Sequence, residues 1–470
     1  MKMLIAGEWI DKAEKINVEN PYDQSVVDTV PRGTAADMKR ALDSAVEGAR
    51  IARRMSVSQR QEILYGVARI VKENQEDFAR TIASEGSKTI REARKEAFRC
   101  VNTLTVSAEE ARRILGETLP FDSVKGGETK TGYYLRMPIG VIAAITPFND
   151  PLNLVAHKLG PAIAGGNSVV LKPATVTPLS AIKLCQAFMH AGLPAHVLNC
   201  VTGHASEVAE TLVSDPRVRM ISFTGGVEAG EKVVKMAGLK KIGMELGSNS
   251  PVIVMADADL DWAAESCVSG AFWAVGQNCI GVQRIFIERS AYDRFAERFV
   301  AITRKMKVGR QLEEDTDMGP MITLAEAERV ERWIHDAVKR GAKVLTGGKR
   351  KGSLVEPTVL ANVPDGVQIK CDEVFGPAVV LEPVESLDEA IARSNSVDYG
   401  LHGAIFTRDI KQAFKAINEL EVGSVIVNDS TDYRLDQMPF GGVKKSGLGR
   451  EGIKFALQEM TEPKVVCFQL

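Results

Sequence analysis

The sequence has few histidines, no closely spaced cysteines and no long apolar run, and each shortage argues against a class of protein. The six histidines include no His-x-x-x-His pair, and the seven cysteines are odd in number and far apart. A zinc site and a disulfide framework are therefore not expected, and we expect no bound metal and free thiols. No stretch reaches the roughly 18 uninterrupted apolar residues of a membrane span, so no membrane association is predicted.

Charge of either sign is not in excess. The formal net charge is -2 at pH 7, with 26% charged and 45% hydrophobic residues. Nothing in this balance would attract nucleic acid or an anionic membrane, so neither is an expected partner. The opening MKMLIAGEWIDKAE has neither the apolar core of a signal peptide nor the Arg-rich face of a transit peptide, which predicts a cytoplasmic protein.

The order of apolar patterns predicts two α/β units. At 470 residues the chain is long enough for about two or three domains. Residues 34–118 have helical periodicity, whereas from about 139 short apolar runs alternate with helices, as in parallel sheets with crossover helices. A similar alternation resumes after 250. Two segments lie outside both units, GYYLRMPIG after Thr131 and the terminal KVVCFQL, and both can form strands that pair elsewhere in the chain or with another subunit.

Two glycine-rich stretches could bind a nucleotide. GLGREG at 447–452 matches the dinucleotide fingerprint, but no strand precedes it and the chain ends too soon for a full βαβ unit, so a turn is the better interpretation. In ISFTGGVEAG, by contrast, Gly225 and Gly226 follow an alternating strand and Gly230 lies one turn into the next helix. Free N–H groups at such a helix start can hold pyrophosphate.

One cysteine has the surroundings of a nucleophile. In AVGQNCIGVQR, Gly276 is predicted to end the helix that covers 260–275, which leaves Cys279 in the turn beyond it, where a thiol can face a cleft. Cys267 lies on the apolar stripe of the same helix and is predicted to be buried and inert. A cysteine alone is more often structural than catalytic, so partners are needed.

Two partners complete a reaction. Glu245 lies at the strand-to-loop junction of MELGSNSP, and Asn149 follows a strand in TPFNDPLN. Taken alone, they could be a surface carboxylate and a turn residue. Together with Cys279 they suit aldehyde oxidation: the thiol attacks the carbonyl, the amide steadies the oxyanion, a nicotinamide takes the hydride, and the carboxylate activates water.

The sequence resembles the aldehyde dehydrogenase superfamily. The resemblance rests on TPFN, LKPA, FTGG...G, MELG, GQNC, EVFGP and PFGGVKKSG, in the family's order and spacing over essentially the whole chain. It implies that Cys279 is the nucleophile, Glu245 the general base and Asn149 the oxyanion donor. It also implies a set of cofactor-binding residues, namely Thr146, Phe148, Lys172, Thr175, Gly225, Gly226, Gly230, Glu373 and Phe375.

The implied fold is α/β, with a Rossmann-like cofactor domain, an α/β catalytic domain and a small β flap through which dimers or tetramers form. The corresponding ranges are 1–120 and 139–246 for the cofactor domain, 247–446 for the catalytic domain, 121–138 and 462–470 for the oligomerisation strands, and 447–461 for a return to the cofactor domain.

Three positions depart from the common family pattern. Gly226 replaces a frequent serine, and Ser248 replaces a glycine beside the base. Thr175 occupies a position that is often glutamate in NAD-specific members, where the carboxylate takes ribose hydroxyls and repels a 2'-phosphate. We therefore expect NADP to be accepted, alone or with NAD.

The substrate is expected to be a small aldehyde. If the helix after TPFN lines the tunnel as in the family, Asp150, Asn153 and His157 give it a polar lining that a long apolar aldehyde would leave unpaired. Arg99 and Arg434 can clamp an anion, although each can also be a surface ion pair. The segments AHKLGPAIA, VNDS and MPFGGVKKSGLGREG are similar in sequence to those of lactaldehyde and glyceraldehyde dehydrogenases. This similarity favours a hydroxylated or anionic aldehyde, including a sulfonated one, as the substrate.

Several alternatives stay open on the sequence. The substrate can be of the succinate-semialdehyde type. A CoA-acylating enzyme would have little use for Glu245, and a cysteine hydrolase without cofactor would leave the matches at Lys172 and Glu373 unexplained. A non-catalytic nucleotide-binding protein of the same fold would be expected to have lost Cys279 or Glu245, and both are present.

Overall fold

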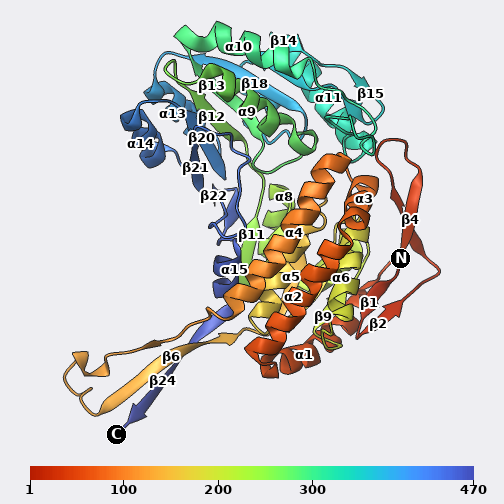
Figure 1. Cartoon of the computed structure of the whole chain (residues 1–470), viewed down its shortest axis with the longest axis vertical. Coiled ribbons are helices and arrows are strands. Elements are labelled where there is room, and N and C mark those ends of the chain that lie inside the picture. The colour runs from red at the N-terminus through yellow and green to blue at the C-terminus, as the bar shows by residue number, and fades with distance from the viewer.

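The computed structural model describes all 470 residues and places them in two layered α/β units with a projecting arm (Figure 1). The units are built on an eight-stranded and a seven-stranded sheet, and the arm on a three-stranded one. No helix is both long and apolar enough to cross a membrane.

The first sheet has five parallel strands at its centre, flanked by antiparallel edge strands. Its order is β2-β1-β9-β8-β7-β10-β11-β23, and its strands cover Met3–Ile5 (β1), Glu8–Ile10 (β2), Val141–Ile145 (β7), Ser168–Lys172 (β8), Leu198–Cys200 (β9), Val218–Thr224 (β10), Lys241–Glu245 (β11) and Gly447–Leu448 (β23). Strand order reverses between β7 and β10, and in sheets of this kind ligands bind outside the carboxyl ends of the strands at that point.

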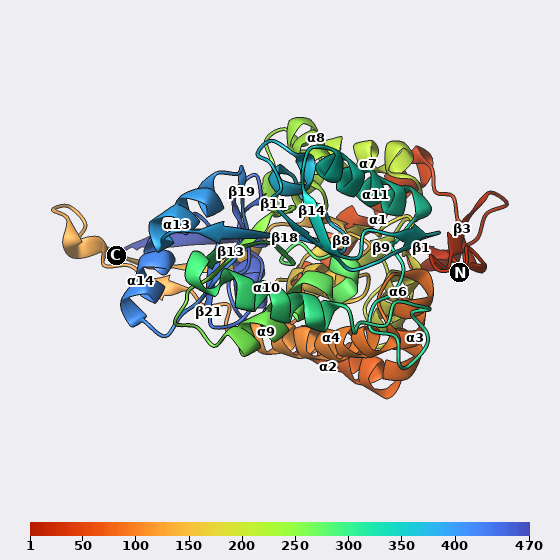
Figure 2. The same ribbon diagram turned by 90° about the horizontal axis from the view of Figure 1, so that it is seen from above.

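Helices cover both faces of this sheet, because its strands are apolar on both sides. In β7, Ile142 and Ala144 face one core while Val141, Ala143 and Ile145 face the other. The first core is packed by α2 (Val57–Glu73), α3 (Gln75–Glu85), α4 (Ile90–Ala111), α5 (Asn153–Ala164) and α6 (Leu179–His190). The second is packed by α1 (Ala35–Arg54), α7 (Ala205–Ser214) and α8 (Val227–Ala237), which lie on the opposite side in Figure 2.

The second sheet, drawn in green to blue in Figure 1, is also mainly parallel. Its order is β14-β17-β18-β13-β12-β20-β21, and its strands are Ser250–Val254 (β12), Val282–Glu288 (β13), Lys343–Thr346 (β14), Thr358–Ala361 (β17), Ala378–Val384 (β18), His402–Phe406 (β20) and Ser424–Val427 (β21). One face is covered by α9 (Leu260–Phe272), α10 (Arg289–Thr303) and α11 (Leu324–Lys339), the other by α13 (Leu387–Asn395) and α14 (Ile410–Glu419).

The two units meet along the segment that joins them. Strand β11 ends at Glu245 and β12 begins at Ser250, so the carboxyl end of one sheet leads directly into the amino end of the other. The chain later returns to the first unit, where β23 pairs with β11 and the short helix α15 (Ile453–Glu459) packs on α5.

The arm consists of the two segments that the sequence left outside both units. Strand β24 (Thr461–Gln469) pairs antiparallel with β6 (Lys130–Pro138) along its whole length, and the short β5 (Glu117–Thr118) adds a third strand. The C-terminal strand therefore pairs within its own chain. The arm projects away from the rest of the molecule in both views.

The remaining elements are short. They are the paired strands β3 (Lys15–Glu19) and β4 (Val26–Pro31), β15 (Arg350–Lys351) and β16 (Leu354–Val355), β19 (Tyr399–Gly400) and β22 (Val443–Lys444), and the helical turns η1 (Phe121–Ser123), η2 (Trp273–Gly276) and α12 (Gln368–Cys371).

Candidate active site

The segment before Cys279 is a kinked turn. The helix predicted over 260–275 ends earlier, at Phe272, and is followed by η2. Ala274, Val275 and Gly276 have φ angles of +48°, +64° and +66°, the left-handed region that costs a non-glycine residue about 1–2 kcal/mol. A Cβ on Gly276 would lie 2.3 Å from the carbonyl oxygen of Gly376, so glycine is required there. The kink turns the chain out of the helix and leads to Cys279.

A buried carboxylate of α4 holds this kink. The Ala274 N–H donates to Oε1 of Glu92 at 2.9 Å, and the Thr89 N–H donates to Oε2 at 2.8 Å. Burial raises the pKa of Glu92. Glu92 and Ala274 are 182 positions apart, so no local pattern connects them.

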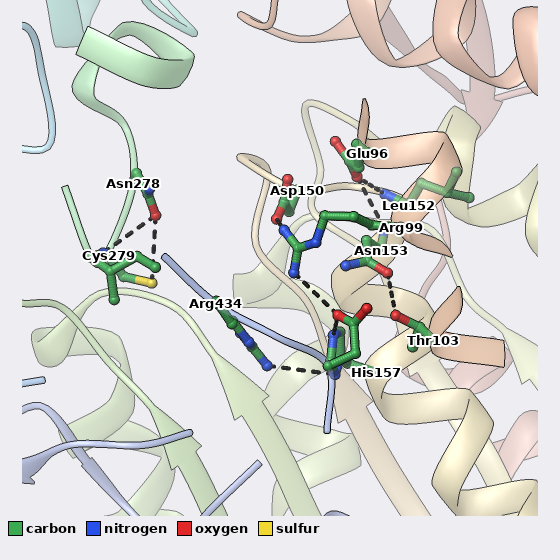
Figure 3. A network of polar contacts seen from close by, with 12 residues as sticks. Glu96, Arg99, Thr103, Asp150, Leu152, Asn153, His157, Asn278, Cys279 and Arg434 are labelled. Carbon is green, nitrogen blue, oxygen red and sulfur yellow. Dashed lines mark hydrogen bonds and ion pairs between the residues drawn. The ribbon is translucent and has the colours of Figure 1, made fainter. Parts of the chain in front are cut away.

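Cys279 lies on the wall of a cavity of about 520 Å³, together with Asn149. Its side chain is partly buried, with Sγ 4.0 Å from Oδ1 of Asn278 (Figure 3). Burial raises the pKa of the Cys279 thiol to about 12, and the positive charge of Arg434 acts in the opposite direction. Cys267, in contrast, is completely buried and does not line the cavity, as its place on the apolar stripe predicted.

Asn149 is positioned by the loop between β7 and α5. The N–H groups of Leu152 and Asn153 donate to Oε1 of Glu96 at 2.8 and 3.0 Å, which fixes the start of α5. At the other end of the loop, the Thr146 N–H donates to the carbonyl oxygen of Lys172 at 3.3 Å. A loop fixed at both ends can hold the Asn149 amide at one place on the cavity wall.

Glu245 is a buried carboxylate with an unused acceptor. It ends β11, is 4% exposed, and its Oε2 has no hydrogen-bond partner. Burial and the neighbouring Glu451 raise the pKa of Glu245, while Arg434 and Lys158 act in the opposite direction. A carboxylate whose pKa is raised in this way is a stronger proton acceptor. Its side chain lies on the wall of a small cavity beside Glu451, and Glu451 contacts Arg434, which lines the cavity of Cys279.

Two charged residues beside Glu245 were not recognised from the sequence. Nζ of Lys158 lies 3.0 Å from Oε1 of Glu451, and both side chains are buried. Burial raises the pKa of Glu451, but the charges of Lys158 and Arg434 outweigh it and lower this pKa to about 2. Glu451 lies in the GLGREG stretch that was set aside as a turn. The available signal was Lys158 itself, a lysine in the apolar helix α5.

The start of α8 fits a pyrophosphate. Gly226 is the N-cap of α8, no side chain caps this helix, and nothing lies within 4 Å of the place where a Gly226 Cβ would be. The exposed N–H groups can therefore approach an anion. Gly230 is required for a different reason. A Cβ there would lie 2.5 Å from the Leu246 side chain, so this glycine allows α8 to pack closely.

The other residues implied for the cofactor border the same unit. Nζ of Lys172 donates to Oγ1 of Thr175 at 3.3 Å, and burial lowers the pKa of Lys172 to about 8. At the junction of the two units, Oε1 of Glu373 accepts the Ser248 N–H at 2.8 Å, and burial raises the pKa of Glu373 to about 7. A buried lysine and a partly buried carboxylate near open backbone fit a dinucleotide with two riboses.

Two aromatic rings extend this surface. Phe148 and Phe375 contact edge to face, with ring centroids 5.7 Å apart. Phe375 has a φ of +43°, a strained backbone conformation that is found mainly where surrounding contacts impose it. The pair joins the loop that carries Asn149 to the segment that carries Glu373.

Arg99 and Arg434 both lie on the wall of the Cys279 cavity, but neither is free. Arg99 contacts Asp436 at 3.2 Å and Asp150 at 3.9 Å (Figure 3). Arg434 contacts Oε2 of Glu451 at 3.3 Å, and its Cζ lies over the Phe440 ring, 3.6 Å from the ring centroid. Both contacts of Arg434, to Glu451 and to His157, use Nη2, so Nη1 remains for a ligand.

Asn153 and His157 differ from the prediction, because they lie behind the cavity wall and not on it. Asn153 is fully buried and accepts a hydrogen bond from the Thr103 hydroxyl at 2.8 Å. Nε2 of His157 lies 3.0 Å from Asp436, and burial, followed by Arg434, lowers the pKa of His157. The two side chains turn inward because α4 and the loop of Asp436 offer them polar partners. No group of three or more His, Cys, Asp or Glu side chains is arranged to hold a metal ion.

Comparison with known proteins identifies the family. The aldehyde dehydrogenase family model matches residues 9–466, nearly the whole chain. The chain belongs to the aldehyde dehydrogenase family, as the resemblance predicted, and is an NAD(P)-dependent aldehyde dehydrogenase.

Relatives with different substrates are similar over their full length. An aspartate-semialdehyde dehydrogenase of Pseudomonas canavaninivorans is 50% identical over 455 residues, 97% of each chain. A 3-sulfolactaldehyde dehydrogenase of Priestia megaterium is 46% identical, covering 100% of this chain and 98% of the relative.

Solved structures have the same fold. Aldehyde dehydrogenase 21 from Physcomitrella patens, in complex with the reaction product succinate, superimposes with a TM-score of 0.97 at 39% identity, covering 100% of this chain and 98% of the other. The glyceraldehyde-3-phosphate dehydrogenase GapN from Methanocaldococcus jannaschii, complexed with NADP, gives 0.94 at 38% identity, covering 98% and 100%. The predicted α/β aldehyde dehydrogenase fold is thereby confirmed.

Proposed function

We propose that this dehydrogenase oxidises a small aldehyde that carries an anionic group, with or without a neighbouring hydroxyl, to the carboxylic acid. The observation that carries the proposal is the single cavity lined by Cys279, Asn149, Arg99 and Arg434. It combines a thiol and an amide, suited to a carbonyl, with guanidinium groups, suited to an anion. Its volume of about 520 Å³ is within the usual range of small-molecule sites.

Chemistry begins at the Cys279 thiol. Sγ adds to the carbonyl carbon and forms a thiohemiacetal, whose oxyanion accepts a hydrogen bond from the Asn149 amide. Bound NAD(P) supplies the acceptor for the hydride, and the carbon left on Sγ is a thioester. Because the pKa of the thiol is about 12, Cys279 must lose its proton to a base as it attacks or have its charge stabilised.

Glu245 completes the cycle as general base. Its carboxylate takes a proton from the water that attacks the thioester, and the acid and the free thiol are released. Thioester hydrolysis, and not transfer to a second thiol, is the expected outcome because this base is present.

For the cofactor, we propose that α8 holds the pyrophosphate through the N–H groups after Gly226, with Gly225 beside them. Lys172 and Thr175 are assigned to the adenosine ribose, and Glu373 to the nicotinamide ribose, with Phe375 and Phe148 at its side. Thr146, whose N–H donates to the carbonyl oxygen of Lys172, fixes the start of the loop between β7 and α5. The open helix start, the buried Lys172 and the partly buried Glu373 favour this placement.

The substrate class has two candidates. Sulfonated or hydroxylated three-carbon aldehydes are favoured by the 3-sulfolactaldehyde relative, and the guanidinium groups suit their anion. A four-carbon semialdehyde of the succinate or aspartate type is favoured by the aspartate-semialdehyde relative and by the structure with bound succinate. The cavity wall carries polar and charged side chains that would suit either and would leave hexanal without matching contacts.

The decisive experiment measures reduced-nicotinamide formation with NAD and NADP separately. The aldehydes are 3-sulfolactaldehyde, lactaldehyde, glyceraldehyde, succinate semialdehyde and hexanal, with Cys279→Ala as the control. We expect the highest kcat/KM with an anionic aldehyde and none in the variant. A folded wild-type protein that oxidises hexanal as well as the anionic aldehydes would contradict the proposed substrate class.

We also propose a homo-oligomer, a dimer or a tetramer, that forms through the arm. The arm exposes Tyr133, Val465 and Phe468, which are 39%, 58% and 48% exposed. A narrow β-arm that projects into solvent with exposed apolar side chains is marginally stable alone, so a partner surface is expected to cover it.

A further inference from the structure

The wall of the Cys279 cavity carries equal numbers of both charges. Its four cations are Lys88, Lys95, Arg99 and Arg434, and its four carboxylates are Asp150, Glu265, Asp429 and Asp432. A wall built for a purely anionic substrate would have an excess of cations. A balanced wall suits a ligand that itself carries both charges, provided that one group of each sign is free to bind it.

Among the four carboxylates, only Asp432 has neither a cationic partner nor the backbone N–H of another residue as a partner. Asp150 is paired with Lys88, and Glu265 lies 3.4 Å from Arg298. Asp429 accepts hydrogen bonds from the Ser266 hydroxyl at 2.6 Å and from the Ser430 N–H at 2.8 Å. Asp432 accepts from the hydroxyl of Ser430 and from its own backbone N–H, and it lines the cavity.

The donor on this wall lies on the same loop. Arg434, two residues after Asp432, lines the cavity, and its contacts to Glu451 and His157 both use Nη2, which leaves Nη1 for a ligand. Burial is the main cause that raises the pKa of Asp432, whereas the Ser430 hydroxyl and the charge of Lys95 act in the opposite direction. Lys95 lies over the Trp273 ring, with Nζ 5.0 Å from the centroid, and forms no ion pair with Asp432. An acceptor and a donor on the wall of one cavity suit a ligand that carries both an ammonium and a carboxylate.

We propose that Asp432 binds a protonated amine of the substrate while Arg434 binds the anionic group beside it, so that the enzyme prefers a zwitterionic amino-acid semialdehyde. This inference rests on the proposed function and narrows its substrate class. It assigns Asp432 a role in specificity, because the chemistry at Cys279 is the same with or without the amine. A charge-assisted hydrogen bond to a buried carboxylate is strong enough to favour such a substrate at least tenfold.

The test compares two aldehydes that differ only in the amine. The kcat/KM values of aspartate semialdehyde and succinate semialdehyde are measured for the full-length protein with saturating cofactor. For the wild type we expect a ratio of at least ten in favour of aspartate semialdehyde. We expect Asp432→Asn to bring this ratio close to one, and Asp432→Glu, which keeps the charge, to retain part of it. Asp429→Asn is the matched control and should keep the wild-type ratio, since its carboxylate already has two donors.

A third aldehyde separates charge from hydrogen bonding. In the hydroxyl analogue, an OH group replaces the amine and can donate to Asp432 without carrying charge. Equal kcat/KM values for the hydroxyl and amine compounds would overturn the ammonium assignment. A wild-type kcat/KM ratio near one between aspartate semialdehyde and succinate semialdehyde would also overturn the ammonium assignment. This result does not depend on whether Asp432→Asn folds, and it would leave the proposed function intact. If neither semialdehyde is oxidised while hexanal is, the proposed function itself fails.

Discussion

Glu92 and Glu96 lie one helical turn apart on α4, and each holds one of the two loops that meet at the cavity. Glu92 accepts the Ala274 N–H at 2.9 Å, and Glu96 accepts the Leu152 N–H at 2.8 Å. The first loop carries Cys279 and the second carries Asn149. Because residues four apart share one face of a helix, a single rigid element sets the separation between the thiol and the amide.

Replacing Glu92 with glutamine is expected to lower both stability and turnover. Glutamine has one oxygen where glutamate has two, so the N–H of either Ala274 or Thr89 loses its acceptor. Leaving one buried group unpaired costs about 1–3 kcal/mol. If the loop then shifts, kcat should fall by roughly ten- to hundredfold. The measurements are the free energy of unfolding from urea titration and kcat with the best substrate.

The control for this variant is on the same helix. Glu109, 45% exposed, contacts only Arg113 at 3.8 Å, so Glu109→Gln should change stability by less than about 0.5 kcal/mol. A Glu92→Gln protein that is less stable but keeps full kcat would show that the carboxylate supports the fold without positioning Cys279.

Thr175 provides a test of cofactor use. Its hydroxyl accepts from Lys172 at 3.3 Å and donates to the carbonyl oxygen of Gly203 at 3.1 Å. A carboxylate at this position would repel a 2'-phosphate, so Thr175→Glu is expected to lower kcat/KM for NADP at least tenfold and to change that for NAD less. Thr175→Gln introduces a side chain of the same size as glutamate but without the charge. An equal loss of NADP use in both variants would assign the effect to crowding and contradict an electrostatic cause.

The arm is expected to control assembly. Replacing the exposed Val465 of β24 with glutamate places a charge on the surface that we propose is covered by a partner. The molecular mass from light scattering should then fall from that of a dimer or tetramer toward the 51.0 kDa of one chain. Val338→Glu, at an exposed position of α11 outside the arm, is the control and should leave the mass unchanged. A wild-type protein that is already monomeric would end the proposal.

Local patterns in the sequence predicted the elements well, because strand and helix periodicities are properties of neighbouring residues. The strand before Asn149, the buried position of Cys267 and the open start of α8 could all be expected in this way. The resemblance added roles for Cys279 and Glu245 that no local pattern would assign.

The partners of charged side chains were not predictable, because they come from distant parts of the chain. Arg99 meets Asp436 across 337 positions, so its pairing depends on the completed fold. For the same reason, nothing local indicated that Glu451 would lie beside Glu245. The end of α9 was placed several residues too late, since the kink at Ala274 depends on a carboxylate of another helix.

The charges around Glu245 predict how the pH profile of turnover should move. Glu245 acts as a base only when ionised, so kcat is lost as pH falls through its pKa. Burial is the main cause that raises this pKa, and the negative charge of Glu451 raises it further. Glu451→Gln removes that charge, so the pKa of Glu245 falls and the acidic limb of the kcat profile should move to lower pH.

Lys158→Met is the opposite test within the same cluster. The lysine charge lowers the pKa of Glu245, so removing it should move the acidic limb to higher pH. Measuring kcat from pH 5 to 9 for both variants distinguishes electrostatic control from general damage, because damage lowers kcat at every pH without moving the limb. Shifts in the same direction, or no shift in either variant, would mean that a group other than Glu245 limits turnover at low pH. Opposite shifts would assign the titrating base to Glu245, because Glu451 and Lys158 carry opposite charges and affect its pKa in opposite directions.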